Sequence, residues 1–448
     1  MSDIQTNKMG TRPVLPLIFS MSLPPLCSMF MQYTYNFVDC IFVAWISEDA
    51  LTAVSLSFPL TTLMLAFSIG TGVGINVLIA RNLGRKDQEA ADNMVSQGLV
   101  LSFLFGALLN ILVLIVMKPY FAAFISDEAI YELCIDYMII CAFMQVPNMV
   151  HIAIQKIIQG TGNMLAPMGF QMAGVLLNFA LDPLLIFGIG PFPQMGIQGA
   201  AVSTVLGYTF SMLLAFYVLI FTKQKVKIKV KGFRPDVGIF REIFVIGMPS
   251  FIMNALGAFM VTFANMFLIL YSTTAVAFFG AYFKAQQMVV MTVNGLIQGC
   301  IPIMSFNYGA GDSIRLRKAF HYGTVIGVVM MGVGALVLCV FPETVLKIFM
   351  ASDEMLVFGI PALRIMASSY MFNGFATMVA SYMQSINKIR YSIFINLMRQ
   401  LIALVSCMWI FTRLMGMSGV WLAFPAAEII TCVCCVYILK KQPSVQCV

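Results

Sequence analysis

Charged residues are scarce in this sequence: aspartate, glutamate, lysine and arginine together make up 10% of its 448 residues. A soluble domain carries about 25% charged residues, so these side chains cannot cover the surface of a water-soluble protein of this length. The shortage excludes a soluble enzyme, a nucleic-acid-binding domain and a disordered chain, although the formal net charge is +7.

Sequence patterns for catalysis and metal binding are also missing. The chain has two histidines and contains no P-loop, no H-E-x-x-H pair and no G-x-S-x-G elbow. Most of its eleven cysteines lie in apolar runs, where a free thiol packs as a small hydrophobe. Cys432 and Cys435 have C-x-x-C spacing, but no second pair of ligands accompanies them. We therefore expect no enzyme activity, no cofactor and no structural metal.

Long apolar runs are what the chain has in abundance. Apolar residues make up 60% of it, and the mean hydropathy is +0.92. A membrane-spanning helix needs about 20 mostly apolar residues, and about twelve runs of that kind are bounded by charged or turn residues. They lie at approximately 14–46, 51–80, 95–117, 131–157, 165–189, 196–221, 243–271, 276–306, 320–341, 355–386, 391–412 and 417–439. The sequence predicts an all-α membrane protein with about twelve transmembrane helices.

Basic residues orient these spans. If the N-terminus is cytoplasmic, 20 of the 26 lysines and arginines fall in the inner segments, and the outer loops keep only Lys118, Lys347 and Arg413. An excess of basic residues marks the cytoplasmic loops of membrane proteins. We therefore expect both termini in the cytoplasm.

One extended polar segment interrupts the apolar runs near the middle of the chain. It carries a lysine at every second position from Lys223 to Lys231. Such a row suits anionic lipid head groups, but a solvated linker is the simpler interpretation, and we favour it. We expect an N-terminal six-helix lobe over 1–222, a basic cytoplasmic linker over 223–241 and a C-terminal six-helix lobe over 242–448.

The two halves share a sequence repeat. Identical residues coincide at an offset of 225, and Ser126–Glu128 recurs as Ser352–Glu354. The coinciding pairs are Gly70/Gly295, Gly74/Gly299, Asn82/Asn307, Gly84/Gly309, Asp87/Asp312 and Gly98/Gly323, with Gly196/Gly416 and Gly199/Gly419 at an offset of 220. The basic loops correspond as well, so we expect two parallel lobes of six helices each. This design is typical of secondary transporters.

Three carboxylates lie within the predicted spans: Asp39, Asp182 and Glu428. An acid at the centre of a membrane helix costs about 2.5–3.5 kcal/mol, so each must be protonated, paired or placed in a wet cavity. At about 1.5 Å per residue, Asp39 and Asp182 lie at similar depths, roughly 10 Å below the outer ends of their spans. We expect these two acids to share one site in the N-terminal half.

Polar residues accompany these two acids on the same helix faces. Tyr35 lies one turn before Asp39, and Asn178 lies one turn before Asp182. Pro24 predicts a bend in the first span below Asp39.

Glu428 lies near the middle of the last span, in a half that also has intramembrane bases. Its depth matches that of Lys284. The sequence leaves open a neutralising Glu428–Lys284 pair in the C-terminal lobe or a functional role for Glu428.

Four short motifs carry a resemblance to the multidrug and toxic compound extrusion (MATE) family, in particular its MepA-like and DinF-like bacterial branch. They are Tyr35–Val43 in the first span, Leu177–Pro183 in the fifth, Gly196–Thr204 at the start of the sixth and Asn307–Gly311 after the eighth. The resemblance covers nearly the whole chain. It implies two six-helix lobes and a multidrug antiporter of the bacterial cytoplasmic membrane.

The resemblance also implies which residues act. Asp39, Asn178, Asp182 and Thr204 match the cation or proton site of the N-terminal lobe, with Tyr35 and Tyr137 as neighbours and Pro24 as the bend in the first helix. Protons are favoured as the coupling ion, and Na⁺ bound by the oxygens of the same four residues stays open. The expected partners are cationic or aromatic small molecules and the lipid bilayer, not nucleic acid, and by family analogy the protein is a monomer.

One departure concerns the C-terminal lobe. NorM-type members carry an acidic residue on the seventh helix, and Gly257 stands at that position here. The resemblance therefore leaves ion coupling to the N-terminal lobe.

Three other functions compete with drug export. The main alternative is a flippase of lipid-linked precursors from the same superfamily, which needs arginines to hold phosphates, but only Arg364 and Arg399 lie within spans, against three acids. A major-facilitator transporter ranks low because the segment Arg81–Asp87 does not follow that family's loop signature. A membrane enzyme would need a polar catalytic cluster, and the sequence offers none.

Overall fold

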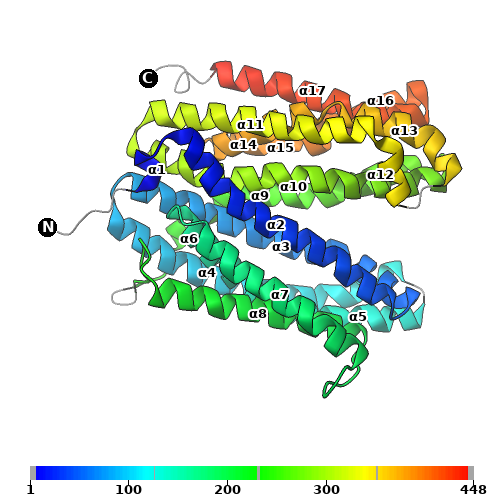
Figure 1. The fold of residues 1–448 in the computed structure, drawn as a ribbon, viewed down its shortest axis with the longest axis horizontal. Helices are drawn as coiled ribbons and strands as arrows, with labels where there is room; N and C mark the ends of the chain where they lie inside the picture. Colours follow the sequence, from blue (N-terminus) through cyan, green and yellow to red (C-terminus); the bar gives the residue numbers. More distant parts are fainter. Residues whose placement is uncertain (1–6, 126, 230–232, 350–351, 442–448) are drawn as a thin grey trace. The chain divides into compact units, whose positions relative to one another are not determined.

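The computed structural model describes residues 7–125, 127–229, 233–349 and 352–441, and throughout these ranges the chain is helix or loop (Figure 1). Within the described residues, ten helices are long and apolar enough to cross a membrane, and the number rises to twelve if each of two bent helix pairs is one span. The prediction of an all-α protein with about twelve transmembrane helices is confirmed.

The helices follow one another with short connections, apart from the linker between α8 and α9. They are α1 (Lys8–Thr11), α2 (Val14–Ala44), α3 (Glu48–Gly84), α4 (Gln88–Phe124), α5 (Glu128–Phe143), α6 (Gln145–Gly160), α7 (Leu165–Phe187), α8 (Ile197–Phe221), α9 (Val237–Leu268), α10 (Thr273–Ala310), α11 (Ser313–Val340), α12 (Pro342–Ile348), α13 (Asp353–Ala367), α14 (Tyr370–Ser385), α15 (Ile389–Leu397), the π-helix η1 (Met398–Ile402), α16 (Ala403–Met415) and α17 (Met417–Lys441).

The chain forms two compact units. The C-terminal unit contains residues 1–26 and 252–448, and the N-terminal unit contains residues 27–251. Both boundaries fall inside helices, α2 and α9, whereas the lobes expected from the sequence meet in the linker over 223–241. The division into lobes of 1–222 and 242–448 stays a prediction.

Corresponding loops of the two halves have the same local structure. Asp87 and Asp312, which are 225 residues apart, each accept a hydrogen bond at 2.9 Å from the backbone N–H three residues on, and so begin α4 and α11. The residue before each aspartate is left-handed, with φ of 62° at Lys86 and 73° at Gly311. This conformation costs a lysine more than a glycine, so the repeat keeps the turn even where the residue type differs.

The repeat extends to the bent helices. α5 and α6 meet at 42°, and the corresponding pair in the second half, α13 and α14, meets at 40°. Gly196 and Gly416 precede α8 and α17 with φ of 56° and 63°. The sequence repeat is therefore a repeat of backbone structure as well.

Close packing of α7 on α8 positions the polar residues of the N-terminal unit. A Cβ atom added at Gly174 on α7 would lie 2.7 Å from the carbonyl oxygen of Gly207 on α8. Only glycine permits backbones to approach this closely. The contact lies one turn from Asn178, and it brings the side chains of the two helices within hydrogen-bonding distance.

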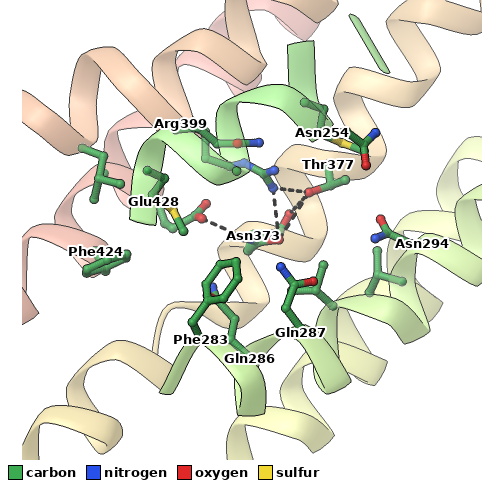
Figure 2. Close-up of a pocket in the computed structure, with 18 residues that line it drawn as sticks. Asn254, Phe283, Gln286, Gln287, Asn294, Asn373, Thr377, Arg399, Phe424 and Glu428 are labelled. Atoms are coloured by element: carbon green, nitrogen blue, oxygen red, sulfur yellow. Dashed lines mark hydrogen bonds between the residues drawn. The ribbon is translucent and has the colours of Figure 1, made fainter. Parts of the chain in front are cut away.

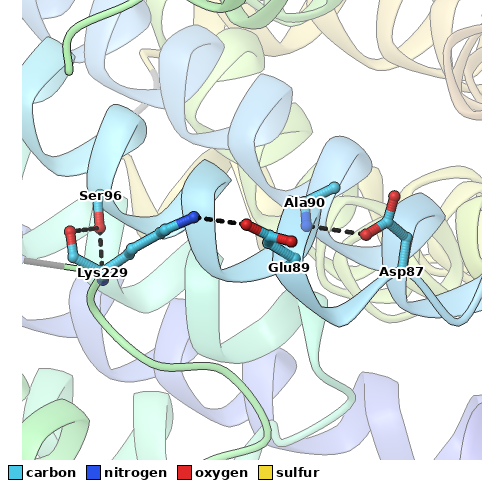
Figure 3. A network of polar contacts seen from close by, with 5 residues as sticks. All are labelled: Asp87, Glu89, Ala90, Ser96 and Lys229. Carbon is cyan, nitrogen blue, oxygen red and sulfur yellow. Dashed lines mark hydrogen bonds and ion pairs between the residues drawn. The ribbon is translucent and has the colours of Figure 1, made fainter. Parts of the chain in front are cut away.

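The linker is held along α4 by its backbone. Asp92 accepts a hydrogen bond from the Lys227 N–H at 2.9 Å, and Ser96 Oγ accepts one from the Lys229 N–H at 2.7 Å. Val226 is fully buried. Figure 3 shows Lys229 between Ser96 and Glu89, whose carboxylate is 2.8 Å from the Lys229 ammonium. The exposed side chains of Lys223 and Lys227 are solvated, but the linker itself is fastened to one helix.

Candidate functional site

Polar side chains from α2, α7 and α8 meet inside the N-terminal unit. In the amide orientation that satisfies its neighbours, Asn178 on α7 donates a hydrogen bond to Asp182 Oδ2 at 3.1 Å, and its nitrogen is 2.7 Å from the Tyr35 hydroxyl on α2. Its oxygen accepts from the backbone N–H of Thr204 on α8 at 3.2 Å. The Tyr35 hydroxyl is also 3.4 Å from Thr204 Oγ1. One asparagine therefore links three helices.

Asp182 is fully buried and hydrogen-bonded through both oxygens. Asn178 reaches Oδ2 from one turn earlier on the same helix, as the sequence spacing predicts. Ser203 Oγ on α8 donates to Oδ1. Burial of a carboxylate is tolerated when its oxygens are hydrogen-bonded in this way.

Asp39 lies one turn beyond Tyr35 on α2, and the Tyr35 hydroxyl contacts Asn178, which is hydrogen-bonded to Asp182 on α7. Its Oδ1 atom is buried, and within the described residues it has no hydrogen-bond partner. Tyr137 on α5 is hydrogen-bonded to Cys141 and interacts electrostatically with Asp39 and Tyr35. The expected site residues therefore gather in one place, which we call the coupling cluster: Tyr35, Asp39, Tyr137, Asn178, Asp182, Ser203 and Thr204.

Ser203 is the member of the coupling cluster that sequence reasoning missed. It directly precedes Thr204 in the motif at the start of the sixth span. A serine inside a helix usually bonds its own backbone, and the Ala200 carbonyl oxygen, 2.9 Å from Ser203 Oγ, competes with Asp182 for the single hydroxyl proton. The spacing from Asp182 gave no signal, because the contact depends on how closely α7 and α8 pack.

The coupling cluster offers carboxylate, amide and hydroxyl oxygens. Hard oxygen ligands of this kind suit either a proton or a hard cation such as Na⁺. Across the described ranges, no three histidine, cysteine, aspartate or glutamate side chains gather as a metal site would require.

The first helix passes through its two prolines without interruption. α2 is continuous from Val14 to Ala44, with Pro24 and Pro25 inside it. The boundary between the two compact units follows directly, between Leu26 and Cys27. Bending at Pro24 stays a prediction.

A second polar site lies within the C-terminal unit, as a partly open cavity of about 140 Å³ (Figure 2). Asn373 on α14 stands between two opposite charges: its amide nitrogen donates to Glu428 Oε1 on α17 at 2.8 Å, and its oxygen accepts from Arg399 Nη1 at 3.1 Å. Arg399, on the π-helix, also donates to Thr377. A π-turn is wider than an α-turn and is common at functional sites.

The expected pairing of Glu428 with Lys284 is wrong for this structure. The side chain of Lys284 is exposed, and none of the ion pairs found in the described residues joins it to Glu428. Glu428 interacts instead with Asn373 and, electrostatically, with Arg399. Depth along a helix, which suggested the pair, does not fix the direction in which a side chain points.

Comparison with known proteins shows that both halves of the chain match one protein family. A family model described as MatE matches residues 24–184 and again residues 249–409. The two matched segments begin 225 residues apart, which is the offset of the sequence repeat. Each half of the chain is therefore one copy of the same family unit.

Relatives of known name cover almost the whole chain. The FAD transporter of Shewanella oneidensis is 24% identical over 430 residues, which is 96% of this chain and 95% of that protein. The multidrug export protein MepA of Staphylococcus haemolyticus is 23% identical over 96% of this chain and 94% of its own. MepA of Staphylococcus aureus is 24% identical over 99% and 98%.

Solved structures agree with the fold. A structure of the outward-facing conformation of a multidrug resistance MATE family transporter of the MOP superfamily matches with a TM-score of 0.91. It is 24% identical to this chain, and the match covers 99% of this chain and 100% of that one. A crystal structure of MATE in the bent conformation matches with a TM-score of 0.89 at 25% identity, over 95% and 94%.

Proposed function

The chain belongs to the MatE family of multi-pass membrane transporters, and from that membership we propose that it is an antiporter that exports lipophilic, cationic compounds across the bacterial cytoplasmic membrane. Transport in this family is coupled to cations. The observation that carries the proposal is the contact inside one unit between Asn178, which donates to Asp182 at 3.1 Å, and Tyr35, which lies one turn before Asp39.

The coupling cluster has the properties that exchange requires. Two carboxylates close together in a medium of low dielectric constant repel each other. Binding of a proton or Na⁺ to one of them relieves this repulsion and is therefore favoured. Asp182 is held by Ser203 and Asn178, whereas Asp39 keeps an unpaired oxygen within the described residues. We assign proton uptake to the pair as a unit, and the unpaired oxygen of Asp39 favours protons over Na⁺ because a proton needs only one such atom.

Neutralising the pair would change what the cluster holds in place. Asp39 lies on the same continuous helix as Pro24, and a proline removes a backbone hydrogen bond from its helix. Loss of the charge at Asp39 would remove its repulsion from Asp182 and let that part of α2 move, and bending at Pro24 would then expel the bound compound.

The names of the relatives point to different substrates. The FAD transporter and the MepA protein of Staphylococcus aureus have the same sequence identity to this chain, 24%. FAD carries two phosphates, and phosphate recognition favours clustered arginines. Arg364 is exposed and donates to the Cys339 carbonyl at 3.0 Å, which leaves Arg399 in the cavity of the C-terminal unit. The acids within the spans therefore support cationic compounds over FAD and over lipid-linked phosphates.

The test is dye export from proteoliposomes containing the full chain. Ethidium movement is measured under an imposed pH gradient, under an imposed Na⁺ gradient, and without either. We expect export with the pH gradient, and its loss in Asp39→Asn and Asp182→Asn. The exposed acid Glu132 on α5 supplies the matched control, Glu132→Gln, which should export normally.

Two results would contradict the proposal. Full export by Asp182→Asn would contradict the assignment of the coupling site to Asp39 and Asp182. Export driven by a Na⁺ gradient but not by a pH gradient would show that Na⁺, not the proton, is the coupling ion. Unchanged ethidium levels together with accumulation of lipid-linked sugars in cells lacking the protein would favour a flippase.

A further inference from the structure

The cavity of the C-terminal unit contains hydrogen-bond acceptors that no group of the described residues uses. Glu428 Oε2 is buried, as are Gln286 Oε1 and Gln400 Oε1, and none of the three has a hydrogen-bond partner in the described part of the chain. A buried acceptor left unpaired costs about 1–3 kcal/mol. All three residues line the same cavity, so together they point to a ligand that donates hydrogen bonds.

The same cavity also offers donors. Both hydrogen bonds of Arg399 in the described residues use Nη1. Its Nε and Nη2 atoms therefore remain for a ligand that also carries acceptors. A planar guanidinium group presents its donors in a fixed fork, which suits a flat partner with carbonyl groups.

Charge decides between a cation and a neutral compound. Glu428 and Arg399 balance each other, because the single amide of Asn373 bridges them. A cationic ligand would leave a net positive charge beside Arg399 in a medium of low dielectric constant, and an uncompensated buried charge is costly. A neutral compound with N–H and carbonyl groups uses the same atoms without that cost.

Size and lining decide the shape of the ligand. The cavity measures about 140 Å³, close to the ~150 Å³ of an engineered cavity that takes one benzene ring. Phe283 and Phe424 contribute aromatic surface to its lining. Aromatic side chains favour stacked or edge contacts with a flat ring. The space suits one ring of a compound whose remainder lies outside.

We propose that this cavity is a second ligand site, which binds the edge of a flat, uncharged nitrogen heterocycle carrying an N–H beside carbonyl groups. Glu428 accepts the hydrogen bond from the ring N–H, and Arg399 donates to a ring carbonyl. The site lies in a different unit from the coupling cluster, and it needs no ion gradient to bind its ligand.

The experiment compares two fluorescent probes that differ by one methyl group. 1,8-Naphthalimide is flat and uncharged and has an imide N–H between two carbonyls, and N-methyl-1,8-naphthalimide lacks that donor. Each is titrated into the purified full-length protein in detergent. We expect the N–H compound to bind about ten- to a hundredfold more tightly, as for a hydrogen bond to a charged acceptor.

Variants test which side chains bind the N–H and carbonyl groups of the probe. Glu428→Gln should weaken binding of the N–H compound about tenfold and leave the N-methyl compound nearly unchanged. Arg399→Lys keeps the charge but loses the fork, so it should weaken both compounds. Glu354→Gln, which changes an exposed acid at the start of α13, is the control and should bind both compounds as the unchanged protein does.

Equal affinities of the unchanged protein for the two probes would overturn the proposal, and so would equal losses in Glu428→Gln and Glu354→Gln. If Glu428→Gln does not fold, the affinities of the two probes for the unchanged protein and for Arg399→Lys test the proposal. Because binding is measured without a gradient, its failure leaves ethidium export by the coupling cluster standing. Binding without any ethidium export would instead support this site and contradict the proposed function.

Discussion

The hydroxyl group of Ser203 on α8 donates a hydrogen bond to the carboxylate of Asp182 on α7. Together with Asn178, it occupies both oxygens of that carboxylate. Asp39, on α2, has a buried oxygen without any partner in the described residues. The two acids of the coupling cluster are therefore not equivalent: both oxygens of Asp182 are hydrogen-bonded, whereas Asp39 keeps a buried oxygen without a partner in the described residues.

Ser203→Ala tests whether fixing Asp182 matters. The change leaves a buried carboxylate oxygen without its donor, so we expect about 1–3 kcal/mol less stability and slower gradient-driven ethidium export. Thermal unfolding in detergent and proteoliposome transport measure the two effects. Ser55→Ala removes an exposed serine that bonds only its own helix, and it should change neither; a Ser203→Ala protein with normal transport would show that Asn178 alone holds Asp182.

Gly174→Ala tests the close contact of α7 with α8. The added methyl group would clash with Ser211 Oγ and meet the Gly207 carbonyl oxygen at 2.7 Å, so we expect a loss of about 1–3 kcal/mol. Gly169→Ala on the same helix adds its methyl group to open space and should be neutral or gain up to about 1 kcal/mol from helix propensity. Thermal unfolding of both variants is the measurement, and equal melting temperatures would count against a backbone contact.

Gln97→Ala tests how the linker is held. Gln97 donates to the Arg234 carbonyl at 2.7 Å and accepts from the Asp236 N–H at 3.1 Å. Its loss should free the linker, and trypsin should then cut at the linker lysines several-fold faster. Glu89→Gln breaks only the exposed ion pair with Lys229, which is worth about 0–1 kcal/mol, so its cleavage rate should stay close to that of the unchanged protein.

Reporter fusions test the orientation expected from the basic loops. Fusions at residues 87, 229 and 445 should give cytoplasmic signals, and fusions at 49, 127 and 353 should give external ones. An external signal at residue 229 would contradict a cytoplasmic linker between two halves with six spans each.

The sequence was sufficient where a property depends on one helix at a time. The one-turn spacings from Tyr35 to Asp39 and from Asn178 to Asp182 follow from the period of an α-helix, whereas the expected depth of the two acids in the membrane stays a prediction. The helical spans and their repeat are local properties too, because caps such as Asp87 act within a few residues.

The sequence was insufficient where a contact depends on how helices face one another. Ser203 reaches Asp182 because Gly174 allows two backbones to meet, and nothing in the spacing of those residues reveals it. Glu428 was matched with Lys284 by depth, but the wide turn of η1 presents Arg399 to the cavity instead. A π-turn changes the direction of the side chains that follow, and the sequence carries no pattern for it.

The position of the unit boundaries inside α2 and α9 has a consequence for any attempt to split the gene. A cut in the linker would give a first fragment whose N-terminal arm has its partners in the second, since Arg315 donates to the carbonyls of Met9 and Arg12. The second fragment would begin with an arm whose Phe244 and Phe251 pack on Phe67 of the first. Each fragment would be incomplete alone, and the pair would reassemble only by exchanging arms, in the manner of a domain swap.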